Sequence, residues 1–136
     1  MKILKIAGSA GFGLVLSTGV ALAATPALYT AAQAKAGAGV YAQSCAMCHG
    51  ADLKGGAGPD LLGQAFAAPS NHYTIGAIFS EVAEQMPAGQ PGSLTHEQYD
   101  DVMAYLLQKN GYPAGAKPLD YSATLKSGAP LVSQMK

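Results

Sequence analysis

The stretch SCAMCHG, residues 44–50, contains the chain's two cysteines, Cys45 and Cys48, with His49 directly after the second. Two thiols at this spacing can form a redox-active disulfide, supply half of a zinc site, or bond covalently to a haem. Each of these chemistries needs different surroundings, so the rest of the sequence decides among them.

The N-terminal residues indicate export. Lys2 and Lys5 precede an uncharged apolar run that ends in small residues near Ala23, a pattern typical of a secretory signal peptide over residues 1–23. A run of this length could also cross a membrane. Because Gly, Ser and Thr dilute it and no basic cluster follows, we expect cleavage, a periplasmic location and no permanent membrane anchor.

Charge and length limit the partners and the size of the fold. Removal of the signal peptide leaves six lysines against eight acidic residues, and the chain has no arginine. No basic patch is available to bind phosphates, so nucleic acid is not an expected partner. The remaining length fits one small domain over residues 24–111, expected to be monomeric, followed by a proline-containing extended tail over residues 112–136.

Haem attachment explains all three residues of the motif. A redox disulfide of the thioredoxin kind needs a βαβ context, whereas the surrounding Ala- and Gly-rich sequence favours a helix followed by a loop. A zinc site needs further ligands, but His72 and His96 lie far along the chain without partners at metal spacing. Two thiols bonded to one porphyrin bring His49 beneath the ring, where its imidazole can bind the iron. The sequence therefore favours one covalently attached haem c per chain.

Three helices must position this group. The first opens at Thr30, which forms a capping box with Gln33, and runs to the cysteines. Gly37 and Gly39 interrupt it at a cost of about 1 kcal/mol each relative to alanine, which suggests a close helix crossing.

The second helix is expected over residues 74–85, where apolar residues recur at helical spacing and Pro87 follows. The third begins at another capping box, Thr95 with Gln98, and ends at Asn110-Gly111. No strand pattern is visible, so the fold class is all-α.

An electron-carrying haem iron takes a second axial ligand on the face away from the histidine. Met86 is the best-placed candidate, because it ends the apolar face of the second helix and enters a Pro-Ala-Gly loop. Its thioether would stabilise ferrous iron and raise the reduction potential. We expect the other candidates elsewhere: Met103 in the core, Met135 in the tail, and His72 and His96 at the surface.

Two segments at the ends of the domain resemble those of the class I c-type cytochromes. GAGVYAQSCAMCHG is similar to the start of that family, with Gly37, Tyr41 and Cys45 at the family's spacing. DVMAYLLQKNG is similar to its C-terminal helix, and this implies that Tyr105 packs over Gly37 and Tyr41.

Two further segments resemble the family's haem contacts. GPDLLG, residues 58–63, is similar to the loop after the haem motif; this implies that the Pro59 carbonyl accepts a hydrogen bond from His49 and that Leu61 lies against the haem. QMPAG resembles the segment of the axial methionine, which implies that His49 and Met86 are the two iron ligands.

The resemblance implies a small cytochrome c fold, with three main helices and loops wrapped around one covalently attached haem. The implied function is electron transfer rather than catalysis, between a dehydrogenase and a terminal oxidase or other redox acceptor. The whole pattern most resembles the single-haem cytochromes that accompany periplasmic quinoprotein dehydrogenases. Because no arginine or lysine ring is present, partner recognition should depend on apolar contact around the haem edge.

Two alternatives from other classes stay open. One is a haem enzyme or gas sensor with an open distal iron site, in which His72 or Tyr73 would act as a distal acid. The other is a haem-free exported helical domain with a Cys45–Cys48 disulfide.

Overall fold

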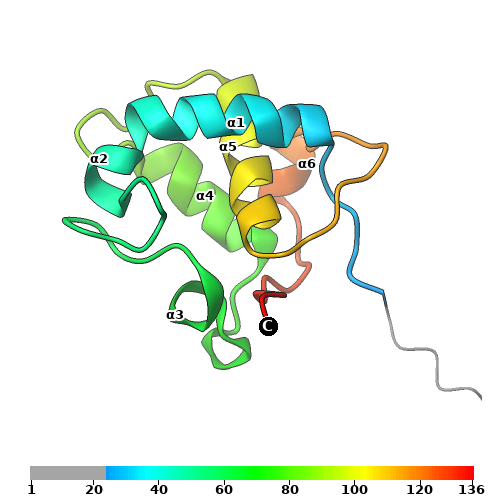
Figure 1. Ribbon diagram of the computed structural model, residues 1–136. Helices are drawn as coiled ribbons and strands as arrows, with labels where there is room; N and C mark the ends of the chain where they lie inside the picture. Colours follow the sequence, from blue (N-terminus) through cyan, green and yellow to red (C-terminus); the bar gives the residue numbers. More distant parts are fainter. Residues whose placement is uncertain (1–23) are drawn as a thin grey trace, which may run out of the picture.

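The computed structural model describes residues 24–136, which form a group of helices joined by long loops (Figure 1). The elements, in chain order, are α1 (Ala31–Ser44), α2 (Ala46–His49), α3 (Gly63–Ala67), a 3-10 turn (Pro69–Asn71), α4 (Ile75–Gln85), α5 (His96–Lys109) and α6 (Tyr121–Leu125). Over this range there is no β-strand, only two isolated bridges. The all-α fold with three main helices, α1, α4 and α5, is confirmed.

The predicted signal peptide, residues 1–23, lies outside the described residues. Export and cleavage therefore stay predictions. Between residues 24 and 136, no helix is both long enough and apolar enough to cross a membrane.

The three main helices begin at the residues that the sequence predicted. The Thr30 hydroxyl accepts the N–H of Gln33 at 3.2 Å, and the Gln33 side chain accepts the N–H of Thr30 in return. Thr95 and Gln98 form the same reciprocal pair before α5, and the Thr74 hydroxyl caps α4. These caps satisfy backbone N–H groups that have no partner within the helix.

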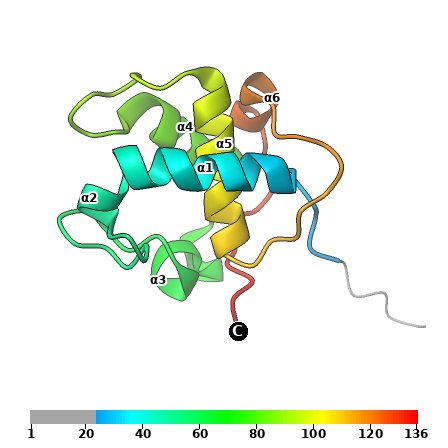
Figure 2. The same ribbon diagram turned by 45° about the horizontal axis from the view of Figure 1, so that its top comes forward.

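Helix α1 crosses α5 closely at Gly37 (Figure 2). A Cβ on Gly37 would lie 1.8 Å from the carbonyl oxygen of Asp101 and 3.0 Å from the Cβ of Tyr105. Tyr105 also packs on Tyr41, with ring centroids 5.3 Å apart. The crossing at Gly37 is therefore confirmed, but Gly39 faces open space and has no part in it.

The buried apolar side chains form two clusters. The larger cluster joins α4, α5 and the C-terminal segment, and includes Phe79, Tyr99, Met103 and Leu131. The smaller cluster consists of Tyr41, Leu53, Val102 and Leu106. Because partly buried Cys45 and Leu61 pack against the smaller cluster, it supports the region in which the sequence predicts the cofactor.

The C-terminal residues 112–136 are more structured than the expected extended tail. They include the helix α6, Tyr121–Leu125, and then return along the domain, where the N–H of Leu131 donates to the carbonyl of Tyr73 at 2.8 Å. Leu131 is buried. A five-residue helix is too short to show a periodic pattern, although Asp120, which caps it, was a visible start signal.

Helix α5 meets α6 at a buried carboxylate. Asp100 is 7% exposed, and its Oδ1 has no hydrogen-bond partner among the described residues. Burial first, and then the negative charge of Asp120, raise the pKa of Asp100 to about 6; Asp101 also raises this pKa, while the backbone amide of Tyr121 and the side chain of His96 lower it. The folded protein therefore disfavours the ionised form of Asp100.

We expect Asp100→Asn to be more stable than the wild type near pH 8, with the gain disappearing near pH 4. The folded-state pKa of about 6 lies above the unfolded value of 3.8, so the wild type loses stability as the pH rises between these values. Thermal melting across this pH range measures the effect. Glu84→Gln, which removes an exposed carboxylate of α4, is the control. A gain that is equal at both ends of the range would contradict the prediction.

Candidate functional site

The two cysteines lie at the junction of α1 and α2. Cys45 separates these helices, and the N–H of His49 donates to its carbonyl at 3.0 Å, so one helical turn carries both thiols and the imidazole. Both thiols are free and half-buried. Burial, followed by the neighbouring Cys48, raises the pKa of Cys45. A thiol kept protonated in this way lacks the lowered pKa of a disulfide-exchange centre.

The ring of His49 is held by the loop that follows α2. Its Nδ1 lies 2.9 Å from the carbonyl oxygen of Pro59. A carbonyl can only accept, so we assign the proton to Nδ1 and a lone pair to Nε2. A Cβ on Gly58 would lie 2.9 Å from the ring Cε1, so this glycine lets the loop lie against the ring. The hydrogen bond implied by the family resemblance is present and leaves Nε2 available to a metal.

A buried asparagine ties the same loop to α5. Asn110 is completely buried; its amide donates to the carbonyl of Leu61 and its side-chain oxygen accepts the N–H of Gly63, both at 3.0 Å. In the sequence, Asn110 is visible only as part of a helix end. No local signal could have shown its role, because its partners lie 47 and 49 positions away.

Met86 directly follows α4 in an extended conformation. Its N–H donates to the carbonyl of Val82 at 3.3 Å, and its own carbonyl accepts the hydroxyl of Tyr99 at 2.8 Å. The local sequence around Tyr99 gives no sign of this bond. Its contact with Met86 is a tertiary one between the end of α4 and the first turn of α5.

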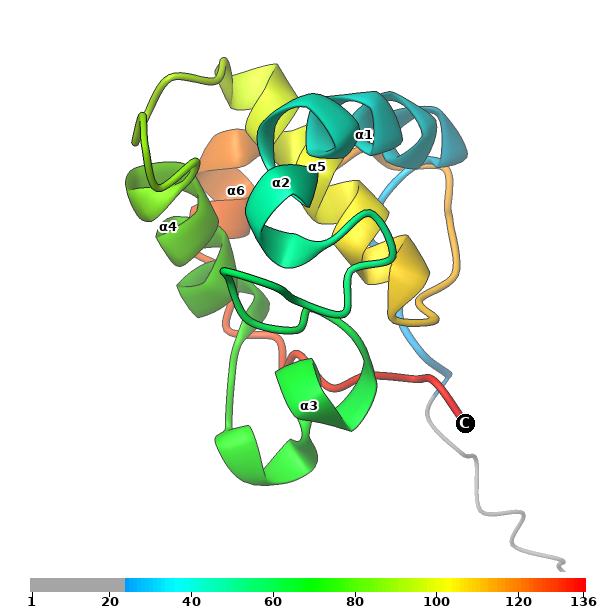
Figure 3. The same ribbon diagram turned by 60° about the vertical axis from the view of Figure 1, so that its left-hand side comes forward.

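One cavity of about 750 Å³ brings the predicted site residues together: it is lined by Cys45, Cys48, His49, Pro59, Leu61 and Met86. Helix α2 and its following loop lie on one side of this region and α4 on the other (Figure 3). Apolar side chains of α4 and α5 complete the wall, among them Ile78, Val82, Val102 and Leu106. The volume lies within the range of about 300–1,000 Å³ that is usual for cofactor sites.

The other four candidates for the distal iron ligand do not line this cavity. Met103 is buried in the larger core cluster, and Met135 is exposed near the C-terminus. His72 is exposed, and His96 stacks on a tyrosine of α6 with ring centroids 3.7 Å apart. Tyr73, considered as a distal acid, does line the cavity.

The donor set of the cavity fits a covalently attached haem. Two free thiols on one helical turn can form two thioether bonds, while His49 and Met86 line the cavity from different parts of the chain. The apolar wall suits a porphyrin. No group of three or more His, Cys, Asp or Glu side chains between residues 24 and 136 is placed to hold a metal ion, so the zinc alternative gains no support there.

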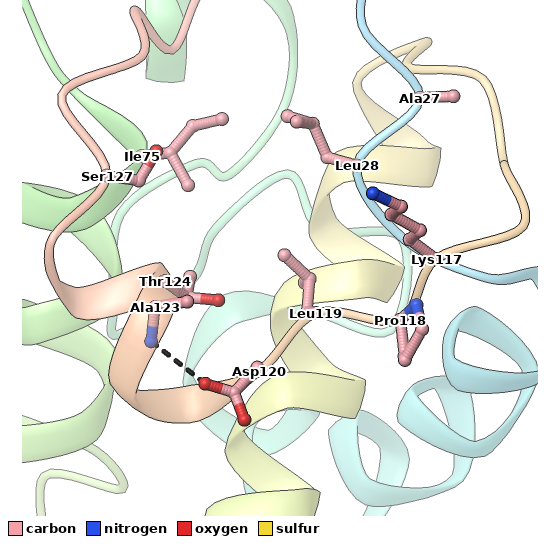
Figure 4. A pocket seen from close by; sticks show the side chains of 10 residues that line it. All are labelled: Ala27, Leu28, Ile75, Lys117, Pro118, Leu119, Asp120, Ala123, Thr124 and Ser127. Carbon is pink, nitrogen blue, oxygen red and sulfur yellow. Dashed lines mark hydrogen bonds between the residues drawn. The ribbon is translucent and has the colours of Figure 1, made fainter.

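A second, smaller cavity of about 270 Å³ lies between the N-terminal segment, the start of α4 and the region of α6 (Figure 4). Its wall is mostly apolar, with Lys117 and Asp120 as the charged lining residues. Asp120 already accepts the N–H of Ala123 at 3.0 Å as the cap of α6. This cavity contains none of the predicted site residues.

Comparisons with known proteins bear on the family and the fold of this chain. The family model described as cytochrome c oxidase, cbb3-type, subunit III matches residues 32–106, more than half of the chain. The fold is similar to a chain in the crystal structure of the sulfane dehydrogenase SoxCD from Paracoccus pantotrophus, with a TM-score of 0.53, 22% identity, and coverage of 85% of this chain and 68% of that chain. No curated protein matches the chain. The chain therefore belongs to the c-type cytochromes, in the family described as cytochrome c oxidase, cbb3-type, subunit III.

Proposed function

We propose that this cytochrome is a periplasmic, monomeric electron carrier with one haem c, covalently attached and ligated by His49 and Met86. The single observation that carries the proposal is the cavity of about 750 Å³, because it brings together both thiols, the imidazole of His49 and Met86. These four groups come from two separate parts of the chain, and all belong to residue types that bind haem.

Each of these residues would have its own role in holding the haem. When bound, the haem iron supplies a one-electron couple between its ferric and ferrous states. Cys45 and Cys48 prevent dissociation through their thioether bonds, His49 offers its Nε2 to the iron, and the carbonyl of Pro59 fixes the orientation of that ring. Met86 would offer its thioether as the second iron ligand. If His49 and Met86 both held the iron, no open position would remain for a substrate, and this favours a carrier over an enzyme.

The apolar wall contributes by keeping water from the iron. Val82, Val102 and Leu106 line the cavity, and the last two belong to the buried smaller cluster. A water-poor, rigid surrounding changes little when the iron charge changes, which favours rapid electron transfer and stabilises the lower iron charge.

We propose a dehydrogenase as the electron donor, with the quinoprotein class suggested by the sequence resemblance, and a terminal oxidase or other redox protein as the acceptor. The similar solved structure bears the name of a dehydrogenase, and the family description names an oxidase subunit. The lining residues Met47 and Tyr73 are 93% and 39% exposed. Docking through apolar contact at this edge is consistent with the lack of arginine in the chain.

The test is to produce the chain with a haem-attachment system and to record its spectra. We expect a sharp reduced α band that stays with the protein in denaturant, and a weak near-infrared band from sulfur ligation in the oxidised form. Cys45→Ser combined with Cys48→Ser should lose haem under denaturing conditions, because no thioether bond remains. Met47→Ser, which changes the exposed residue between the two thiols, should retain it.

Each outcome has a defined meaning. Covalent haem without the sulfur band, together with ready binding of carbon monoxide, would favour the enzyme or sensor alternative. No haem in the wild type would return the two thiols to the disulfide alternative.

A further inference from the structure

We infer that Tyr99 is a positioning residue for Met86: its hydroxyl fixes the backbone at which the methionine enters the cavity and thereby keeps the thioether on the iron. This inference rests on the proposed function, in which Met86 is the distal ligand. It assigns a role to a side chain that has no contact with the haem cavity of its own, since Tyr99 is not among the lining residues.

The backbone of Met86 is held at both of its polar groups. Its N–H donates to the carbonyl of Val82 at 3.3 Å, which closes the last turn of α4. Its carbonyl accepts the Tyr99 hydroxyl at 2.8 Å, a short distance for a bond of this type. The methionine is therefore fastened to α4 on one side and to α5 on the other.

The bond from Tyr99 has no substitute in the segment that follows Met86. Within residues 86–94, the other backbone hydrogen bonds are internal to the loop: the N–H of Gln90 donates to the carbonyl of Pro87 at 2.7 Å, and the N–H of Ser93 donates to the carbonyl of Gln90 at 3.2 Å. Residues 88–93 are exposed. Among the hydrogen bonds of the described residues, the one from Tyr99 alone connects this segment to α5.

Tyr99 itself is well fixed. It is 2% exposed and lies in the first turn of α5, directly after the capping box of Thr95 and Gln98. Its N–H donates to the carbonyl of Thr95 at 3.0 Å, and its ring lies 6.4 Å from that of Tyr121 between centroids. A hydroxyl held by a buried ring and a capped helix end is a rigid donor, which suits a positioning role.

The consequence for the iron should be larger in the oxidised state. A thioether is a soft ligand and stabilises ferrous iron, so its bond to ferric iron is the weaker of the two. Loss of the Tyr99 hydroxyl leaves the Met86 carbonyl without its donor and frees the loop to move. The free energy that this hydrogen bond contributes then no longer opposes release of the thioether from ferric iron.

Tyr99→Phe in the haem-loaded protein tests the inference, with Tyr29→Phe as a matched control. The Tyr29 hydroxyl also donates to a backbone carbonyl, that of Tyr112, at 2.7 Å, and its ring is 1% exposed, but it does not line the cavity. Both variants keep the buried ring and lose one hydrogen bond from the tyrosine hydroxyl to a backbone carbonyl. Any difference between them in iron ligation therefore reports positioning and not general loss of stability.

We expect Tyr99→Phe to bind imidazole at ferric iron about tenfold more tightly than the wild type does, because the competing thioether is less well held. The near-infrared sulfur band of Tyr99→Phe should also disappear at a lower temperature on heating and at a lower pH in an alkaline titration. Tyr29→Phe should retain the wild-type temperature and the wild-type pH of this loss. Equal imidazole affinity in the two variants, with the sulfur band present in the wild type, would overturn the inference alone. Absence of the sulfur band from the wild type would instead refute Met86 ligation and the inference with it.

Discussion

We expect Met86→Ala to leave the haem attached but to lower its reduction potential and open the iron to small ligands. Alanine removes the thioether without changing the two thiols or His49, so covalent attachment and the proximal ligand remain. A thioether favours ferrous iron; its loss should lower the potential by roughly 0.1 V or more, within the range of about 0.8 V that axial ligands span. A redox titration and carbon monoxide binding to the reduced protein measure the two effects.

Met47→Ala is the matched control for this experiment. It makes the same substitution in another residue that lines the cavity, but Met47 is 93% exposed and lies between the two cysteines. It should leave the potential and ligand binding unchanged. A wild-type potential in Met86→Ala would show that Met86 is an ordinary core methionine and would remove the assignment of the distal ligand.

Gly37→Ala should strongly destabilise the fold. The added Cβ would lie 1.8 Å from the carbonyl oxygen of Asp101, and this neighbour is backbone of α5, which cannot turn away as a side chain can. The two helices must separate, and we expect a loss of about 3 kcal/mol or more, at or beyond the upper end of overpacking costs. Urea denaturation of the haem-loaded protein gives the free energy of unfolding.

Gly39→Ala provides the control in the same helix, two residues away. A Cβ at Gly39 meets nothing within 4 Å, so the variant should gain roughly 1 kcal/mol from the better helix propensity of alanine. The two variants therefore shift the denaturation midpoint in opposite directions. Equal losses in both would mean that the α1–α5 crossing is looser than the structure indicates.

The crossing also matters for the site. Helix α1 ends at Cys45, while α5 contributes Val102 and Leu106 to the cavity wall and leads into Asn110. A shift of α5 away from α1 would move these groups relative to the thiol. The close approach at Gly37 therefore helps to position elements that line the cavity, although Gly37 itself does not line it.

Local patterns in the sequence determined the long helices and the chemical motif. The capping boxes at Thr30 and Thr95 and the helical spacing of apolar residues involve neighbours within a few positions, so they can be read without a fold. The thiol–thiol–imidazole spacing is equally local. The family resemblance added Pro59 and Leu61 and favoured Met86, and the hydrogen bond between His49 and Pro59 is present as that resemblance implied.

Tertiary structure decided everything that depends on residues far apart in the chain. It distinguished Gly37 from Gly39, which have the same local sequence character, because only the position of α5 determines which one is crowded. It revealed Asn110 and Tyr99 as anchors of the site, since their partners belong to other elements. It also showed α6, too short to leave a periodic pattern.

The cavity is the clearest example of a feature that depends on tertiary structure. From the sequence, haem attachment at Cys45 and iron ligation by Met86 are two separate hypotheses, joined only by resemblance to a family. In the folded chain both line one cavity, because the α1–α5 crossing positions the thiols and α4, ended at Met86, faces them. Residue types alone determined which groups could bind a haem, and the packing of three helices decided that these groups line one cavity.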